Sequence, residues 1–172
     1  IAVMDSVDVR FADQWLSNLE DALQGKTPDY LVIQHMEPDH SGSIQQFIQT
    51  YPQTKLVGNT KTFTMLKNYF GSDYPENQLM VKNGDTLPLG SRTLTFVFAP
   101  MVHWPEVMMT YDSASKILFS ADAFGTFGPR ETTTSWIDEA RRYYFGIVAP
   151  YGKQVQALFK KLTAYDIQVL YP

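Results

Sequence analysis

The feature that most constrains the fold is a change of pattern halfway along the 172-residue chain. The first half alternates short apolar runs with helical patterns, which is typical of an α/β fold with some parallel strand pairing. The predicted strands are Ile1–Met4, Tyr30–Ile33 and Lys55–Val57, and the predicted helices cover about 8–24, 44–51 and 60–70.

Two of these helices carry more detailed predictions. In the first helix, apolar residues recur at every fourth position, at Phe11, Trp15, Leu19 and Leu23. This spacing predicts that one face of the helix is buried. In the last helix, Thr60 stands where an N-cap is expected, because its hydroxyl can accept a hydrogen bond from a free backbone N–H of the first turn.

The second half of the sequence predicts mostly short strands separated by turns. They lie at Leu79–Val81, Thr86–Leu89, Leu94–Ala99, Val107–Tyr111 and Ile117–Ser120. Turn signals such as Asn83-Gly84 separate them, so several should pair antiparallel. Helices at about 136–145 and 152–162 and a final strand at Ile167–Tyr171 complete the pattern. The fold class is therefore α/β with mixed sheets.

Composition excludes several kinds of protein. The chain has no Cys, which excludes disulfides, thiolate metal ligands and a Cys nucleophile. Its formal net charge is -4 without a single-sign block, so neither nucleic acid nor an anionic membrane surface is expected as a partner. No apolar run approaches the ~20 residues that a membrane-spanning helix needs. The sequence starts at Ile1 without a visible signal peptide, and we expect a cytoplasmic location.

Two of the three His in the chain lie in one six-residue window, His35-Met36-Glu37-Pro38-Asp39-His40. The window follows the predicted strand Tyr30–Ile33, and α/β proteins place ligands at the carboxyl ends of such strands. Pro38 keeps Glu37 out of helical geometry, which gives a turn able to direct four ligating side chains inward. The simpler interpretation is a surface loop in which these His and acidic groups only hydrogen-bond to one another.

Two further candidate ligands follow other predicted strands. His103 lies in the loop after Leu94–Ala99, and Asp122 follows Ile117–Ser120. Imidazole and carboxylate ligands without thiolate suit iron, manganese or zinc. Together with the window they exceed the four ligands of one tetrahedral ion, so their number favours a two-metal site with a bridging carboxylate.

The window resembles the metallo-β-lactamase superfamily motif His-x-His-x-Asp-His, with Glu37 in place of the second His, a replacement that flavodiiron proteins show. Three more segments resemble the same family: Met101–Asp112 (MVHWPEVMMTYD), Ile117–Gly125 (ILFSADAFG) and Arg142–Pro150 (RYYFGIVAP). The resemblance covers nearly the whole chain. It implies a metallo-β-lactamase-like αββα sandwich with mixed sheets, in which residues 1–172 form a partial diiron domain, incomplete at the C-terminus.

The resemblance also implies a role for each candidate ligand. It assigns one iron to His35, Glu37 and His103, the second iron to Asp39 and His40, and the bridging position to Asp122. In the family a further His follows the last strand, and this sequence ends at Pro172 before it. A carboxylate in place of a neutral imidazole adds negative charge and hard oxygen, which favours redox-active iron over zinc.

The function that the resemblance implies is reduction of O2 to water or of NO to nitrous oxide in an intact parent protein. It further implies an FMN-containing flavodoxin-like domain downstream, a rubredoxin-like electron donor and a homodimer. No flavodoxin-like stretch is present in the 172 residues. We therefore expect the chain to be a piece of a flavodiiron protein, trimmed at both ends and inactive alone.

Two other functions stay open on the sequence. A zinc-dependent hydrolase is the alternative, because the metallo-β-lactamase fold hosts that chemistry too. A scaffolding or dimerising role without metal is the third. Iron with O2- or NO-dependent oxidation would support the reductase, whereas zinc with ester, lactam or phosphodiester cleavage would support the hydrolase. Glu37 is the residue that discriminates between the two.

Other residues have simpler interpretations. The apolar residues that flank the ligands are expected to be core or pocket wall rather than redox relays: Met101, Trp104, Met108 and Phe124. The charged pairs Arg130-Glu131 and Arg141-Arg142 are expected to be solvated or to face a partner subunit.

Overall fold

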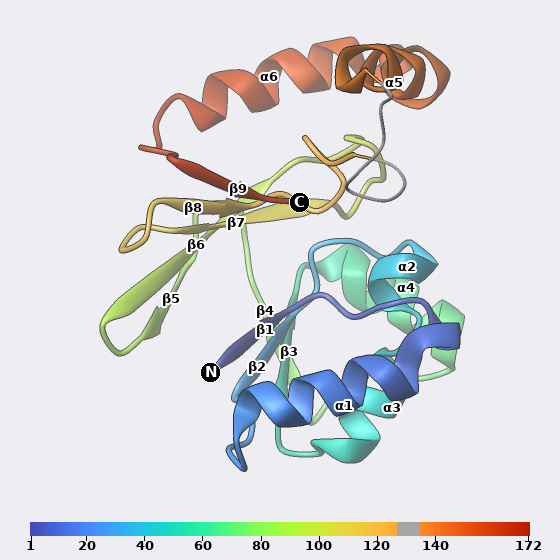
Figure 1. Cartoon of the computed structure of the whole chain (residues 1–172), viewed down its shortest axis with the longest axis vertical. Coiled ribbons are helices and arrows are strands. Elements are labelled where there is room, and N and C mark those ends of the chain that lie inside the picture. Colours follow the sequence, from blue (N-terminus) through green and yellow to red (C-terminus); the bar gives the residue numbers. More distant parts are fainter. Residues whose placement is uncertain (127–134) are drawn as a thin grey trace. The chain divides into compact units, whose positions relative to one another are not determined.

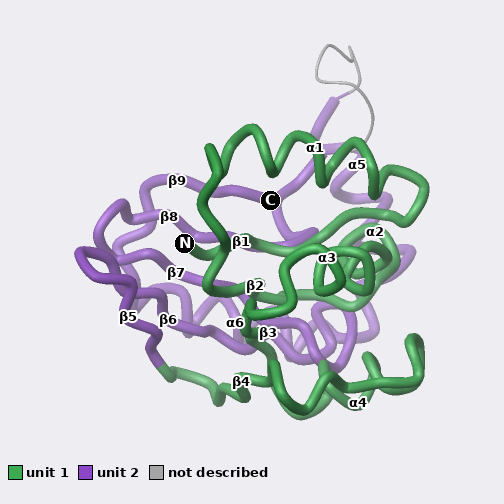
Figure 2. Tube along the Cα trace, turned by 90° about the horizontal axis from the view of Figure 1, so that it is seen from below, with its two compact units in different colours: residues 1–85 green, residues 86–172 purple. Residues whose placement is uncertain are grey.

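A computed structural model of the chain describes residues 1–126 and 135–172, so Arg130-Glu131 lies outside the described residues. The chain divides into two compact units, Ile1–Asp85 and Thr86–Pro172 (Figure 2). Arg141 and Arg142 are exposed and form ion pairs with Asp138 and Glu139 on their own helix, as expected for solvated charges.

Unit 1, residues 1–85, is built on a parallel sheet (Figure 1). Its strands follow one another in sequence order: β1 (Ala2–Met4), β2 (Tyr30–Val32), β3 (Lys55–Gly58) and β4 (Gln78–Met80). All three neighbouring pairs are parallel. The strand predicted at 79–81 therefore completes the first sheet. It belongs to the parallel part of the fold because a helix precedes it, as in the connections before it.

Helices connect the strands of unit 1. They are the 3-10 turn η1 (Val9–Phe11), α1 (Ala12–Leu23), α2 (Pro38–Ser41), α3 (Ile44–Thr50) and α4 (Thr60–Phe70). The prediction that Phe11 lies on the buried face of the first helix is wrong. Phe11 belongs to the preceding 3-10 turn and is 55% exposed, since the change of helix type there breaks the four-residue spacing. Leu23, at the other end of α1, is buried.

The predicted cap of α4 is off by one residue. Asn59, not Thr60, is the N-cap: its Oδ1 accepts hydrogen bonds from the backbone N–H groups of Lys61 and Thr62 at 3.0 and 3.3 Å. The Thr62 hydroxyl accepts the Asn59 backbone N–H in return, which forms a capping box. Thr60 occupies the first helical position, where its backbone lacks an intrahelical partner and its side chain is not needed as a cap.

The core of unit 1 lies between its sheet and helices. Residues of both central strands and of two helices are fully buried in it: Leu31, Val32, Leu56, Val57, Phe47 and Leu66. Each side chain of this size contributes about 1.5–3 kcal/mol through the burial of apolar area. The core therefore fixes the strand β2, and with it the position from which the His35–His40 window leaves the sheet.

Unit 2, residues 86–172, is built on a different kind of sheet. Its strands run in the order β5 (Thr86–Leu89), β6 (Arg92–Phe98), β7 (Met108–Asp112), β8 (Ile117–Phe119) and β9 (Val169–Tyr171). The first four pair antiparallel, as the closely spaced turns predicted. The last strand, β9, pairs parallel with β8.

The helical part of unit 2 consists of α5 (Trp136–Tyr143), a π-helical turn (Tyr144–Val148), a 3-10 turn (Ala149–Tyr151) and α6 (Gly152–Leu162). Figure 1 shows α6 running along the sheet of this unit. Its buried Leu158 and Leu162 pack with Met109 and Leu118 of the sheet in one core cluster. None of the described helices combines the length and apolar character needed to cross a membrane.

Candidate metal centre

The window His35–His40 leaves the sheet directly after β2 and turns into the short helix α2. Glu37 is the N-cap of α2 and has extended backbone geometry, with φ −62° and ψ 147°. Pro38 occupies the first helical position, so the predicted effect of Pro38 on Glu37 is confirmed. The backbone N–H groups of His40 and Ser41 both donate to the Glu37 carbonyl. These features fix the backbone of the turn, and the fixed backbone sets the direction of the window's side chains.

His35 and Glu37 form the first pair of donor atoms. Their Nε2 and Oε2 atoms are 3.3 Å apart. The His35 side chain is fully buried, whereas the Glu37 side chain is 39% exposed. Two ligand atoms that each lie about 2.1 Å from one ion, at right-angled to tetrahedral angles, are about 3.0–3.4 Å apart. The spacing and the nitrogen–oxygen chemistry of this pair therefore fit a shared cation.

His40 and Asp39 form a looser second pair. His40 Nε2 lies 3.9 Å from Asp39 Oδ2, and the Asp39 side chain is 64% exposed. The imidazole rings of His40 and His35 are close to each other, with centroids 5.3 Å apart. The window thus gathers all four predicted ligands, but it fixes His35 by burial and leaves the Asp39 carboxylate largely in solvent.

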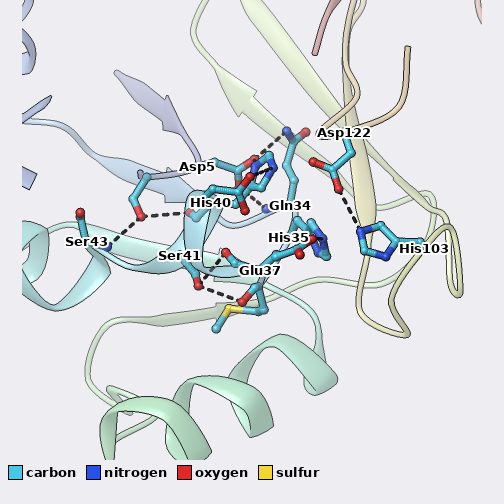
Figure 3. A network of polar contacts seen from close by, with 12 residues as sticks. Asp5, Gln34, His35, Glu37, His40, Ser41, Ser43, His103 and Asp122 are labelled. Carbon is cyan, nitrogen blue, oxygen red and sulfur yellow. Dashed lines mark hydrogen bonds and ion pairs between the residues drawn. The ribbon is translucent and has the colours of Figure 1, made fainter. Parts of the chain in front are cut away.

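A residue that the sequence analysis missed holds His40. The carboxylate of Asp5, at the end of β1, lies 3.2 Å from His40 Nδ1 through its Oδ2 atom (Figure 3). It also accepts the Gln34 backbone N–H at 2.6 Å on Oδ1. The signal was present in the sequence, because Asp5 directly follows the first predicted strand just as the window follows the second. Parallel strands end at the same edge of a sheet, so polar residues after both belong together.

The backbone around the window is braced by residues of the loop after β1. The Ser6 N–H and its hydroxyl both donate to the His40 carbonyl, and the Ser43 hydroxyl donates to the Val7 carbonyl. Gly42 lies so close to this loop that a Cβ atom would be 2.7 Å from the Pro38 carbonyl oxygen and 2.8 Å from the Val9 nitrogen. Only glycine fits at position 42 without a shift of backbone.

Unit 2 contributes its own pair of donors. His103 lies in the loop between β6 and β7, and Asp122 follows β8. His103 Nε2 and Asp122 Oδ2 are 3.1 Å apart, again a spacing that fits two ligands of one ion. The His103 side chain is nearly buried and that of Asp122 is partly exposed. Ala121, the residue before Asp122, has a left-handed backbone with φ 51°, which shows that the chain makes a sharp turn as it leaves the strand.

Aromatic rings surround His103. Trp104 and Tyr143 both meet its ring edge-on, each with a centroid distance of 6.0 Å. Trp104 and Phe124 are partly buried against the core cluster of unit 2, and Met108 is fully buried. The interpretation of Trp104, Met108 and Phe124 as core or wall residues agrees with this packing. The rings restrict the orientation of the His103 imidazole.

The fold and these side-chain pairs define a class of protein. An α/β fold with a parallel and a mainly antiparallel sheet carries imidazole–carboxylate pairs in loops that follow its strands, as in a metallo-β-lactamase-like fold. The family model described as "ODP family beta lactamase" matches residues 1–172, and the chain belongs to this family.

Its relatives are flavodiiron-type proteins. The chain is 35% identical over 176 aligned residues to the anaerobic nitric oxide reductase flavorubredoxin of Aliivibrio fischeri, with 97% of this chain and 35% of the relative covered. Among solved structures, the flavodiiron protein of Giardia intestinalis is 29% identical with a TM-score of 0.83, covering 98% of this chain and 43% of that one.

A second solved structure, the rubredoxin oxygen:oxidoreductase of Desulfovibrio gigas, is also 29% identical, with a TM-score of 0.84. The match covers 95% of this chain and 42% of that protein. The chain therefore spans well under half the length of these relatives. The metallo-β-lactamase-like fold and the kinship with flavodiiron proteins, both predicted from the sequence, are confirmed.

Proposed function

We propose that this chain is the diiron-binding part of a flavodiiron oxidoreductase that reduces O2 to water, NO to nitrous oxide, or both. The observation that carries the proposal is the His35–Glu37 pair, in which the carboxylate of Glu37 lies 3.3 Å from the buried imidazole of His35. The kinship with a nitric oxide reductase and with a rubredoxin oxygen:oxidoreductase supports it. The reaction of the whole enzyme is proposed for the protein that contains this domain.

The proposed ligand sets are the ones that the resemblance to flavodiiron proteins implies. His35, Glu37 and His103 would hold one iron, and Asp39 and His40 would hold the other. Asp122 would bridge the two, because one carboxylate has two oxygen atoms that can bind different ions. Each unit holds one pair of proposed ligand atoms, at 3.3 Å (His35 and Glu37) and 3.1 Å (His103 and Asp122), with the spacing of atoms that share an ion.

Glu37 favours iron over zinc in this proposal. A carboxylate is a harder and more negative ligand than a neutral imidazole, so it stabilises an ion that reaches the trivalent state. The carboxylate stabilises bound zinc less, since zinc stays divalent and does not change its oxidation state. The absence of Cys from the chain agrees with a site of nitrogen and oxygen ligands only.

Bound iron would supply redox chemistry that amino-acid side chains lack. Reduction of O2 to two waters consumes four electrons and four protons, and reduction of two NO to nitrous oxide and water consumes two of each. We propose that FMN in the parent protein and a rubredoxin-like donor deliver the electrons, and that the parent is a homodimer. The chain's own contribution is to hold the ligands: burial orients His35, and the rings of Trp104 and Tyr143 orient His103.

Metal competition tests the proposal directly. The chain would be loaded anaerobically with equal ferrous iron and zinc, and bound metal would be counted by mass spectrometry in the wild type and in His35→Ala and His103→Ala. Preferential binding of iron that both variants lose is the expected result. Preferential binding of zinc, together with cleavage of an ester, lactam or phosphodiester, would refute the proposed reductase function and support a zinc-dependent hydrolase.

Activity in the longer protein that contains this domain completes the test. With a chemical or protein reductant, O2 and NO consumption would be measured separately, and each should depend on bound iron. A protein that binds iron at these residues yet consumes neither gas would refute the proposed reaction while leaving the metal centre in place.

A further inference from the structure

We infer that Asp5 is a positioning residue that fixes the tautomer of His40, with the proton on Nδ1 and the lone pair on Nε2, the atom that would bind metal. The inference rests on the proposed function for the identity of the ligand. It concerns a carboxylate that lies outside the proposed ligand set. The argument begins with the hydrogen bonds of Asp5 itself, which do not depend on any bound ion.

Every close polar neighbour of the Asp5 carboxylate that the structure gives is a donor or can act as one. Oδ1 accepts the backbone N–H of Gln34 at 2.6 Å. Oδ2 accepts the side-chain amide N–H of Gln34 at 3.3 Å and lies 3.2 Å from His40 Nδ1. Asp5 is buried, which strengthens these bonds and makes an unsatisfied carboxylate oxygen costly. The carboxylate is therefore held as an acceptor in one orientation.

This arrangement decides which nitrogen of His40 carries the proton. A neutral imidazole has one N–H donor and one acceptor nitrogen. Because Oδ2 of Asp5 accepts, Nδ1 of His40 must donate, and the lone pair is left on Nε2. That atom points toward the Asp39 carboxylate, at 3.9 Å, where the second ligand pair lies. In metalloproteins a metal-bound His commonly donates its other ring N–H to a carboxylate.

The residue next to Asp5 holds the backbone of His40. Ser6, next to Asp5 in the sequence, donates its N–H and its hydroxyl to the His40 carbonyl at 2.8 and 3.0 Å. Asp5 and Ser6 together thus fix the ring and the main chain of one residue. The two contacts can be separated by mutation, since Asp5 acts on the imidazole and Ser6 acts on the carbonyl.

The replacement Asp5→Asn should reverse the tautomer rather than merely loosen the ring. The Gln34 backbone N–H can only donate, so the Asn carbonyl oxygen must take the place of Oδ1. The Asn NH2 group then faces His40 Nδ1 and donates to it, which moves the ring proton to Nε2. The Gln34 amide can adapt by turning its own oxygen toward the Asn, because Gln34 Oε1 is buried and accepts no hydrogen bond from the described residues. The outcome resembles the wrong-tautomer effect known for a catalytic Asp→Asn replacement.

Nitrogen NMR on the metal-free chain tests the inference without any activity assay. Long-range proton–nitrogen spectra, recorded at mildly alkaline pH where imidazole is neutral, identify which ring nitrogen is protonated. We expect the Nδ1–H tautomer of His40 in the wild type and the Nε2–H tautomer in Asp5→Asn. Ser6→Ala is the matched control: it removes a bond to the same residue and should leave the tautomer unchanged. A wild-type His40 with its proton on Nε2 would overturn the inference.

A ferrous iron titration then separates this inference from the proposed function. Asp5→Asn should weaken the second iron by about 10–100-fold, the range for outer-shell partners, and spare the first. Asp5→Ala should weaken it less than Asp5→Asn, because Ala imposes neither tautomer. If the tautomer reverses and iron binding does not change, Asp5 still positions His40 but His40 is not a ligand, which would count against the proposed metal site. If Asp5→Asn and Ser6→Ala lost the same amount of affinity for the second iron, Asp5 would have only a structural role, and the inference would be refuted.

Discussion

The two units of the chain present metal-binding side chains in different ways. Unit 1 carries four candidate ligands in one six-residue window after a parallel strand, whereas unit 2 carries two that are 19 residues apart in separate loops. The window is braced by hydrogen bonds with the loop after β1, from Ser6 to the His40 carbonyl and from Ser43 to the Val7 carbonyl. His103 is held by aromatic rings of its surroundings instead. A contiguous motif needs a rigid backbone, while dispersed ligands need packed side chains to orient them.

This difference predicts that the two units respond differently to substitution. In unit 1 the sensitive positions should be those that keep the backbone in place around the window. In unit 2 they should be the ligands themselves, because each comes from its own loop. Four substitutions test this comparison.

The largest expected effect is that of Asp122→Ala. If this carboxylate bridges the two irons, its removal should weaken both by at least about 100-fold, since it takes a direct ligand from each ion. Asp39→Ala is the matched variant in unit 1 and should lose only the second iron. Iron content by mass spectrometry and a coupled diiron signal in the Mössbauer spectrum distinguish the two. A coupled signal that survives in Asp122→Ala would refute the bridge.

The sequence alone supports one group of candidate ligands better than the other, and for a physical reason. The ligand character of His35, Glu37, Asp39 and His40 could be proposed from their spacing after an apolar strand, because a local turn determines where such side chains point. His103 and Asp122 could be proposed as ligands only because each follows a predicted strand, which is a weaker local pattern. Their assignment depended on the resemblance to a family, and their 3.1 Å contact depends on tertiary packing.

Asp5, Phe11 and Thr60 mark where the sequence was insufficient. Asp5 acts through an imidazole 35 positions away, and its place after the first predicted strand indicates the edge of the sheet but not this partner. Phe11 and Thr60 were placed by periodicity and by a residue-type preference. Both were wrong because the start of a helix depends on hydrogen bonds that the pattern does not contain, the 3-10 turn in one case and the Asn59 cap in the other.

The next largest effect is expected from Gly42→Ala. A Cβ atom at position 42 would press on two backbone atoms at 2.7 and 2.8 Å, and the nearer one, the Pro38 carbonyl oxygen, belongs to the window. We expect a loss of about 1–3 kcal/mol in the free energy of unfolding, measured by urea denaturation, together with weaker iron binding. Gly146→Ala in unit 2 is the control. Nothing lies within 4 Å of a Cβ there, so stability should be unchanged or slightly higher. Equal stability of both variants would contradict the idea of a rigid window.

A smaller effect is expected from Glu37→His, which changes the kind of ligand and not the backbone. We expect the preference for iron over zinc to fall by about tenfold, because imidazole is a softer, neutral donor. Competition between the two metals in the same solution measures it. Glu20→His, an exposed position on α1, is the control for an added imidazole. An unchanged metal preference in Glu37→His would show that the remaining ligands, and not Glu37, select the metal.

The smallest effect concerns two Arg–Asp pairs, one in each unit. In unit 2, burial raises the pKa of Asp112, but the hydrogen bond from Arg92 at 2.5 Å and that from the Ala114 N–H outweigh it and lower the pKa below the ordinary value. In unit 1, the hydrogen bonds from the exposed Arg10 lower the pKa of Asp8, which is partly exposed. Both carboxyl groups bind protons more weakly in the folded state than in the unfolded chain.

A lowered pKa stabilises the folded state above the unfolded-chain value of about 3.9, and this contribution is lost as the pH falls through the lower folded value. Asp112→Asn should therefore make the free energy of unfolding less dependent on pH in the acidic range. Urea denaturation at a series of pH values measures this dependence. Asp8→Asn should change the pH dependence little, because solvent screens an exposed pair. If both replacements reduced the pH dependence of the free energy of unfolding equally, burial of the carboxyl group would not be what distinguishes the two pairs.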